Sequence, residues 1–340
     1  MKSVRNILAA ACLAAGLAAC GKAAQDQTAG ASGQIVFSIL PTAPAAVLQK
    51  NWQPLLDDMS KATGLTVKAF IPSNYTTLIE AMRFKQTDVG WFSNETGLQA
   101  VRRANGEVFA RTRGPNGVDG YQSVLIVNAK AGVTLDKILK CDKSLSFGQA
   151  DPLSTSGYVA PIAFFFGPHD IQPEKCFRVV RTSTHSANLL AVANGALDVA
   201  TDNGTALALN RQAGRPEADE VKVVWTSPTL PEDPIIWRKD LDPAIKAKVK
   251  AFFLSYAKGD GPEAQRERAL MKPLSIGGFV DADDSHLLTV REVEAREQLA
   301  LARWGGDAAK VGKAQADLNQ VLSDEAAHAT TAPPPASTAP

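Results

Sequence analysis

The stretch Asp151-Pro152-Leu153-Ser154-Thr155-Ser156-Gly157 is the most informative part of this chain. It follows an apolar run, residues 145–148, that is typical of a strand. It precedes residues 158–166, which are typical of a buried helix that ends at Gly167-Pro168. The stretch is therefore predicted to be a strand-to-helix turn, the connection from which an α/β fold is built.

Three hydroxyl side chains, those of Ser154, Thr155 and Ser156, lie at this turn. The first N–H groups of a helix have no partner within the helix, and the helix dipole places positive charge there. Together with the hydroxyls, these groups suit a tetrahedral oxyanion. A single Ser or Thr would be explained as an ordinary N-cap. Three in a row favour an anion site.

The amino-terminal segment has the order of a secretory signal. A basic start, residues 1–5, is followed by an apolar run, residues 7–19, that is too short to span a bilayer. Leu17-Ala18-Ala19-Cys20 resembles the bacterial lipobox, which implies a signal peptide over residues 1–19 and diacylation of Cys20. The alternative is a plain signal peptide cut nearby, with Cys20 incidental.

Both ends of the chain are predicted to lie outside the fold. Residues 20–33 are small and polar, as in a flexible tether, and residues 326–340 are rich in Ala, Thr and Pro, which predicts disorder. About 290 residues remain, enough for two lobes with cores of their own. The net charge is +1 and there is no long basic run, so nothing points to nucleic acid.

Two cysteines fall within the expected fold. Cys141 and Cys176 each precede a strand-like run, residues 145–147 and 177–180, with one helix between them. A strand-helix-strand unit places its strands side by side and parallel, so both thiols would lie at the same edge. In an exported protein we expect a disulfide between them, worth roughly 4 kcal/mol in the chain-entropy model. Two separate free thiols are the alternative.

Strand-like and helix-like runs alternate along the chain, the pattern of an α/β fold with mainly parallel sheets. Residues 35–41 are predicted to form a strand, followed by a helix with apolar residues spaced over 48–59 and a stop at Gly64. A helix and a short turn lead into Asp-Val at residues 88–92 and again at residues 198–202. This repeat predicts two lobes of similar architecture.

Two long apolar runs, residues 121–127 and 221–237, are interpreted as crossover strands that connect the lobes. The predicted division is a discontinuous lobe 1 at 34–123 and 232–305, lobe 2 at 124–231, and a C-terminal helix at 306–325. Charged amphipathic helices at 287–304 and 308–322 are expected on the outside. A ligand would bind between the lobes, at the carboxyl ends of the strands.

Several stretches of this chain resemble one protein family. They are residues 75–84, 120–128, 151–157, 191–194 with 198–201, and 233–239. With the exported, anchored, two-lobed organisation, they are similar to the solute-binding proteins of ABC importers, and more closely to the phosphonate-binding (PhnD-like) group. The resemblance implies a type II-like periplasmic binding protein fold without enzymatic activity or cofactor. It also implies a monomer that captures a small phosphorus oxyanion for an ABC-importer permease.

The resemblance assigns the site residues by position. Ser154, Thr155 and Ser156 would grip the ligand oxygens, Tyr75 and Tyr121 would approach from the other lobe and the first crossover, and His185 could donate to an oxygen. Without the resemblance, His185 would be a solvent-facing residue at a helix start, and both tyrosines would be ordinary half-buried packing residues.

The resemblance also places Asp233 at the ligand. A monoprotonated phosphonate, phosphate or phosphite carries an O–H that an ionised Asp233 can accept, whereas sulfate would meet unpaired like charge. The alternative is a turn residue, because Asp233 stands directly before Pro234.

One position departs from the family pattern. Members that prefer aminoalkylphosphonates have an acidic residue near the helix start after the second Asp-Val strand, and the matching residue here is Thr205. We therefore expect a weak preference for 2-aminoethylphosphonate, with an alkylphosphonate, phosphite or phosphate as the ligand.

Other functions fit less of the sequence. Ser156, His185 and Asp233 are the residue types of a hydrolytic triad, but the chain has no Gly-x-Ser-x-Gly elbow. The four histidines show no metal-ligand spacing, so no metal is expected. A ligand sensor for a membrane receptor, with the same fold, stays open.

Overall fold

The structure, a computed structural model, describes residues 33–331. The predicted signal segment, Cys20 and nearly all of the predicted tether lie outside the described residues. Of the helices within residues 33–331, none has the length and hydropathy of a membrane-spanning segment.

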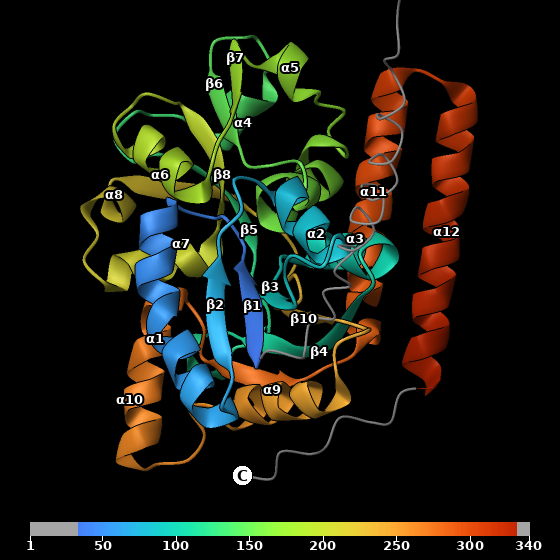
Figure 1. The fold of residues 1–340 in the computed structure, drawn as a ribbon. Helices are drawn as coiled ribbons and strands as arrows, with labels where there is room; N and C mark the ends of the chain where they lie inside the picture. The colour runs from blue at the N-terminus through green and yellow to red at the C-terminus, as the bar shows by residue number, and fades with distance from the viewer. Residues whose placement is uncertain (1–32, 332–340) are drawn as a thin grey trace, which may run out of the picture.

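Two mixed β-sheets, one per lobe, form the framework (Figure 1). The sheet of lobe 1 has the order β11-β4-β10-β3-β1-β2, and that of lobe 2 has the order β7-β6-β8-β5-β9. The strands of lobe 1 are β1 (Gln34–Ile39), β2 (Thr66–Phe70), β3 (Val89–Trp91), β4 (Gly106–Arg113), β10 (Pro234–Arg238) and β11 (Gly278–Asp281). Those of lobe 2 are β5 (Ser123–Asn128), β6 (Ser146–Gln149), β7 (Val179–Thr182), β8 (Val199–Asn203) and β9 (Val221–Thr226).

Helices cover both sheets, as expected for an α/β protein with two lobes. Lobe 1 contains α1 (Ala45–Thr63), α2 (Tyr75–Arg83), α3 (Asn94–Arg103), η1 (Pro115–Gly117), α9 (Pro243–Ser255), α10 (Pro262–Met271), η4 (Lys272–Leu274) and η5 (Asp284–Leu287). Lobe 2 contains α4 (Leu135–Leu139), η2 (Thr155–Val159), η3 (Ile162–Phe166), α5 (Pro173–Cys176), α6 (His185–Ala193), α7 (Gly204–Gln212) and α8 (Pro216–Asp219). Two further helices, α11 (Leu288–Gly305) and α12 (Ala308–Thr331), complete the fold.

The repeated Asp-Val unit has the same structural role in each lobe. Asp88 precedes β3 and its Oδ2 accepts a hydrogen bond from the N–H of Val36 at 2.8 Å. Asp198 precedes β8 and its Oδ2 accepts from the N–H of Ser146, also at 2.8 Å. In both lobes the strand after the Asp has a parallel neighbour on one side and an antiparallel neighbour on the other. The short repeat therefore marks equivalent strands of two similar sheets.

The run at residues 221–237 is not one crossover strand. It forms β9 in lobe 2 and β10 in lobe 1, with residues 227–233 crossing between them. Pro228 and Pro231 interrupt the run, because proline lacks the N–H that a strand interior requires. Residues 227–233 are the second crossing; the first crossing precedes β5. The two crossings pair through Tyr121 and Leu230, with N–H to O=C distances of 3.0 and 2.7 Å.

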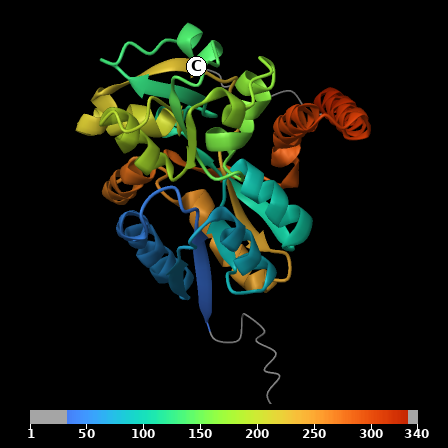
Figure 2. The same ribbon diagram turned by 90° about the horizontal axis from the view of Figure 1, so that it is seen from above.

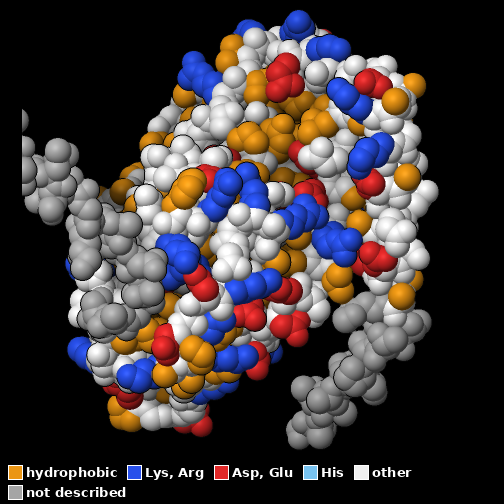
Figure 3. Space-filling view, turned by 45° about the vertical axis from the view of Figure 1, so that its right-hand side comes forward, with side chains coloured by type: hydrophobic (Ala, Val, Ile, Leu, Met, Phe, Trp, Pro, Cys, Tyr) orange, Lys and Arg blue, Asp and Glu red, His pale blue; other side chains and the backbone are white. Residues whose placement is uncertain are grey.

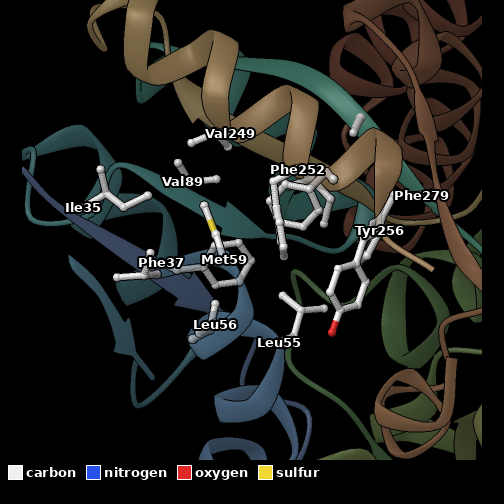
Figure 4. Packing of buried hydrophobic residues seen from close by; sticks show 14 of the residues in the cluster. Ile35, Phe37, Leu55, Leu56, Met59, Val89, Val249, Phe252, Tyr256 and Phe279 are labelled. Carbon is white, nitrogen blue, oxygen red and sulfur yellow. The ribbon is translucent and has the colours of Figure 1, made fainter. Parts of the chain in front are cut away.

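Aromatic and aliphatic side chains fill a separate core in each lobe. In lobe 1, Phe37 and Met59 pack beside Val89 and Phe252 between the sheet and its helices (Figure 4). The hydroxyl of Tyr256 at the edge of this core donates to Asp58 at 2.9 Å, so it is not buried unpaired. In lobe 2 the core is built around Phe147, Phe165, Phe166 and Phe177.

Cys141 and Cys176 are joined by a disulfide in lobe 2, with their Cα atoms 4.4 Å apart. Cys176 is buried and both residues belong to the core of this lobe. The link connects the segments that lead into β6 and β7, which are parallel neighbours.

The two C-terminal helices form a hairpin beside both lobes (Figures 1 and 2). Contrary to expectation, α11 is not an outer helix: Val290 packs in a core of lobe 1, Val293 packs against the crossings, and Ala300 packs in the core of lobe 2. The hairpin closes through Leu299 of α11 and Leu318 of α12.

The helix α12 continues to Thr331, so the boundary predicted at residue 326 is wrong. The segment from residue 326 to 331 is rich in Ala, the strongest helix former, which explains why the helix does not stop there. On the face shown in Figure 3, basic and acidic side chains are interspersed, in keeping with the net charge of +1.

Candidate functional site

The turn at residues 151–157 begins a helix, as predicted. Ser154 is the N-cap of η2, and its Oγ accepts a hydrogen bond from the N–H of Gly157 at 3.1 Å. A Cβ at Gly157 would overlap Ala150 and crowd His185, so this position requires glycine. The helix is wider than predicted: η2 and η3 are π turns on either side of Pro161, which cannot donate a backbone hydrogen bond.

Two helix N-termini of lobe 1 lie against this turn. Asn74 caps α2 and Ser93 caps α3. The N–H of Tyr75 donates to Asp151 Oδ2 at 3.4 Å, and Ser93 Oγ donates to the carbonyl of Leu153 at 3.2 Å. These contacts join the lobes directly, so the structure is a closed form.

A third contact between the lobes involves one of the predicted site residues. The N–H of Glu95 donates to Thr155 Oγ1 at 2.9 Å. The side chain of Thr155 also lies near that of Tyr121, which approaches from the first crossing. The side chain of Thr155 therefore links the start of η2 to lobe 1 and to the crossing.

The second crossing brings Asp233 to the same place. Tyr121 Oη donates to Asp233 Oδ1 at 3.4 Å, and Asn94 Nδ2 donates to the carbonyl of Pro231 at 2.7 Å. Burial and the neighbouring charge of Glu232 raise the pKa of Asp233 well above its usual range. Burial and the charge of Asp233 likewise raise the pKa of Tyr121, so its hydroxyl stays a donor.

Tyr75 is buried on the lobe 1 side, near the side chain of Ser154. Burial is the main cause of its raised pKa, and Asp151 and Asp233 add to it. Both predicted tyrosines are therefore neutral hydroxyl donors at any physiological pH. Their packing role and their place in the site are compatible, because the rings are buried while each hydroxyl lies among polar side chains.

His185 begins α6, but it does not face solvent. Its side chain is only 12% exposed. Nε2 lies 3.2 Å from Ser154 Oγ, and Nδ1 lies 3.1 Å from Asp202 Oδ1. The Ser-His-Asp contact in this chain is thus Ser154–His185–Asp202, rather than the combination of Ser156 and Asp233 with His185.

The structure brings six of the seven predicted ligand-binding residues to the junction of the lobes, in two groups: Tyr75, Ser154 and His185 in one, and Tyr121, Thr155 and Asp233 in the other. The seventh, Ser156, is buried at the same turn, and its carbonyl accepts from Ser123 Oγ at 2.6 Å. Thr205 is partly buried in the first turn of α7.

Sequence reasoning missed three residues at this junction: Asn94, Glu95 and Asp202. A usable signal existed for two of them, because Asn94 and Glu95 directly follow a strand and the N-cap Ser93, the same pattern that identified Ser154. For Asp202 the only signal was its place at the end of β8, and its contact with His185 depends on the fold.

Two hollows of about 310 and 380 Å³ lie along α11, lined by Tyr158 and Trp304 in one case and by Arg291 and Val321 in the other. Neither is formed by the predicted ligand-binding residues. Within residues 33–331, no group of three or more His, Cys, Asp or Glu side chains is arranged to hold a metal ion.

Two α/β lobes, two paired crossings and helix N-termini that meet at the junction define the class of two-lobed periplasmic binding proteins. Residues 37–287 match the family described as the ABC transporter, phosphonate, periplasmic substrate-binding protein. The chain belongs to this family. It is a component of an ABC importer that binds a small phosphonate ligand in the periplasm, and not an enzyme.

Individual relatives agree with this assignment. The chain is 39% identical over 258 residues to the phosphonates-binding periplasmic protein of Escherichia coli strain K12. The matched region covers 76% of this chain and 75% of the relative. A binding protein component of an ABC phosphonate transporter from Pseudomonas aeruginosa has a similar structure, with a TM-score of 0.80 and 35% identity over 87% of this chain and 98% of that one. PhnD1 of Prochlorococcus marinus in complex with methylphosphonate shares the fold, with a TM-score of 0.67 and 20% identity over 77% and 97% of the two chains.

Proposed function

We propose that the protein captures an alkylphosphonate, phosphite or phosphate at the junction of the lobes, through Tyr75, Tyr121, Ser154, Thr155, Ser156, His185 and Asp233. The convergence of donors from both lobes and a crossing on the start of η2 carries this proposal. The names of relatives span the same chemistry: one is a phosphonates-binding protein, one from Mycolicibacterium smegmatis is a phosphate-import protein, and one from Prochlorococcus marinus is a probable phosphite binding protein.

Neutral donors would do most of the binding. The first N–H groups of η2 and the hydroxyls of Ser154, Thr155 and Ser156 would donate to the ligand oxygens. Tyr75 and Tyr121 add phenol donors whose raised pKa keeps them protonated. Closure of the lobes would bury the ligand, and the closed form would be the one that docks on the permease.

The raised pKa of Asp233 changes the expected proton arrangement. An ionised Asp233 would accept an O–H from a monoprotonated ligand, whereas a protonated Asp233 would donate to a fully ionised one. Either way the contact needs one proton between the carboxyl group and the ligand. Discrimination against sulfate then depends on pH, because sulfate brings no proton of its own.

For the rest of the molecule we propose the organisation expected from sequence. The chain would be a monomer anchored by a diacylated Cys20, and its lobes would be residues 34–123 with 232–305 and residues 124–231. The anchor is tested by mass spectrometry of the membrane-bound protein: a diacylglycerol-modified Cys20 at the mature N-terminus is expected, and a water-soluble product from cells that express Cys20→Ser. An unmodified, released wild-type protein would exclude the anchor.

Calorimetric titration of the purified protein with methylphosphonate, 2-aminoethylphosphonate, phosphite, phosphate and sulfate tests the ligand class. Micromolar or tighter binding to one phosphorus oxyanion is expected at pH 8, with sulfate silent. Thr155→Val should weaken binding at least tenfold, since it removes a hydroxyl at the start of η2. Ser183→Ala, in an exposed loop of the same lobe, is the control. No heat from any ligand on folded, ligand-free protein would refute the proposal.

A further inference from the structure

Asp202, at the carboxyl end of β8, makes a contact that the ligand-binding assignment does not include. Its Oδ1 lies 3.1 Å from His185 Nδ1 and also accepts the N–H of Asn203 at 2.8 Å. The carboxyl group is 4% exposed. His185 continues the contact to Ser154, whose side chain lies near Tyr75, so a row of polar groups runs from β8 to the junction of the lobes.

The proton on His185 decides what Ser154 can do. Ser154 Oγ has one proton to donate and two lone pairs, and the N–H of Gly157 already occupies one lone pair. With Nδ1–H directed at Asp202, a neutral ring leaves Nε2 as an acceptor, which takes the Ser154 proton. A doubly protonated ring donates from Nε2 to the second lone pair instead. Only in that state is the Ser154 hydroxyl free to donate to a ligand oxygen.

The charges around the site also favour the doubly protonated form of His185. Among the seven proposed ligand-binding residues, His185 is the one that can become cationic. With a neutral ring, the buried pair of His185 and an ionised Asp202 would carry one negative charge beside a bound oxyanion, which is unfavourable away from solvent. Protonation of the ring makes the pair neutral overall and turns its contact with Ser154 into a charge-assisted one.

We propose that Asp202 is a positioning residue of the oxyanion site: it holds His185 through Nδ1–H and supports the protonated ring, so that ligand binding is coupled to proton uptake at His185. The inference rests on the proposed function of this site. Asp202 would touch no ligand atom and would act through His185 and Ser154.

Other titratable groups face this chain of contacts. Asp151, before η2, accepts from the N–H of Tyr75, and Asp233, before β10, acts electrostatically on Tyr75. The methylphosphonate ligand titrates as well. A test must therefore compare variants at each pH, so that the contributions of Asp151, Asp233, Tyr75 and the ligand cancel in the difference.

The test is calorimetric titration of the purified full-length protein with methylphosphonate, from pH 6.0 to 8.5, in pairs of buffers with different ionisation enthalpies. The buffer dependence of the heat gives the number of protons taken up per ligand. The wild type should take up more protons than Asp202→Asn above pH 7. Affinity in the variant should fall 10- to 100-fold at pH 8 and much less at pH 6, since one charge-assisted contact is lost.

Asp198→Asn is the matched control, because Asp198 precedes the same strand at its opposite end, where it pairs with Ser146. It should match the wild type in affinity and proton uptake. Asp202→Glu should restore part of the proton uptake. If Asp202→Asn does not fold, as judged by circular dichroism, His185→Gln replaces it and should show the same loss of proton uptake.

An Asp202→Asn variant that binds like the wild type, or one that weakens equally at every pH with unchanged proton uptake, would overturn the inference. So would His185→Gln with wild-type proton uptake. In each of these cases the wild type still binds methylphosphonate and the proposed function stands. A folded wild type that binds no phosphorus oxyanion would instead overturn the proposed function, and the inference with it.

Discussion

Asp233 shows how the environment of one residue changes its chemistry. From sequence it is an ionised carboxylate or a turn residue. In the structure its backbone carbonyl accepts from the N–H of Thr112 at 2.8 Å, as at a strand entry, while its side chain lies beside Tyr121. Burial and the charge of Glu232 raise the pKa of this side chain well above its usual range.

The raised pKa predicts pH-dependent selectivity. As the pH falls through this pKa, Asp233 gains the proton that a fully ionised oxyanion requires, so sulfate affinity should rise. Above the pKa the ionised carboxylate should reject sulfate. Asp233→Asn, a permanent amide donor, should bind sulfate at least tenfold better than the wild type at pH 8, as measured by calorimetry. Sulfate affinity that is flat with pH in the wild type would contradict this.

Thr205 gives a second prediction at a single position. Thr205→Glu should raise affinity for 2-aminoethylphosphonate relative to methylphosphonate about tenfold, because a partly buried carboxylate would pair with the ligand ammonium. Thr205→Gln has the same size and no charge, and it should leave the ratio unchanged. Equal ratios in both variants, measured by competition titration, would show that residue 205 does not face the ligand.

Among the elements, α11 departs most from its sequence pattern. Its charged periodicity suggested an outer helix, yet Glu297 is 5% exposed and faces Glu95 of α3. Burial, then the charge of Glu95, raises the pKa of Glu297 to about 8. Burial, then the charge of Glu294, raises the pKa of Glu95 to about 7. Two buried carboxyl groups thus meet where α11 passes the junction.

These shifts predict how stability depends on pH. Because the folded pKa values exceed those of the unfolded chain, both carboxyl groups favour the folded state below about pH 4.5 and lose that contribution as pH rises to about 8. At pH 8.5, Glu297→Gln should therefore raise the free energy of unfolding by on the order of 1–3 kcal/mol, and with it the melting temperature. At pH 4.5 the substitution should change the stability little. Differential scanning calorimetry at both pH values measures this. A stabilisation that is equal at the two pH values would argue against a titrating Glu297.

At the scale of the whole molecule, closure depends on contacts made by few residues from many segments. The lobes meet through the starts of α2, α3 and η2, and α11 packs on both lobes and on the paired crossings. The hairpin partner α12 contributes none of the proposed ligand-binding residues. It covers Leu299 of α11 through Leu318 and Val321.

Removal of α12, from residue 307 onward, is expected to lower the stability of the protein without weakening ligand binding. The loss of buried apolar contacts should cost on the order of 2–4 kcal/mol, seen as a lower urea midpoint. Methylphosphonate affinity, measured on the folded truncation, should stay within a factor of two or three of the wild type. Leu318→Ala should also lower the urea midpoint, by a smaller amount, and leave the affinity unchanged. A truncation with normal stability and lost binding would place α12 in the site.

The disulfide is tested across the same molecule. Mass spectrometry without reduction should find Cys141 and Cys176 linked and resistant to alkylation. The double Cys→Ser variant should lose roughly 4 kcal/mol of stability in the chain-entropy model and keep its ligand affinity, because the link lies at the far edge of lobe 2. Two alkylated thiols in the exported protein would show that the link does not form.

Local chemistry along the chain determined a large part of this protein. Periodicity and turn residues placed most strands, though not β4 or β11, and about half of the helices. Gly64 ended α1 in the left-handed conformation, and three adjacent hydroxyls located the start of η2. Only the tertiary structure decided that residues 221–237 divide between two sheets, that α11 lies against both lobes, and that Asp202 contacts His185. The physical reason is range: caps, turns and hydrophobic spacing act within a few residues, whereas burial and charge pairing depend on groups that meet only when distant segments fold together.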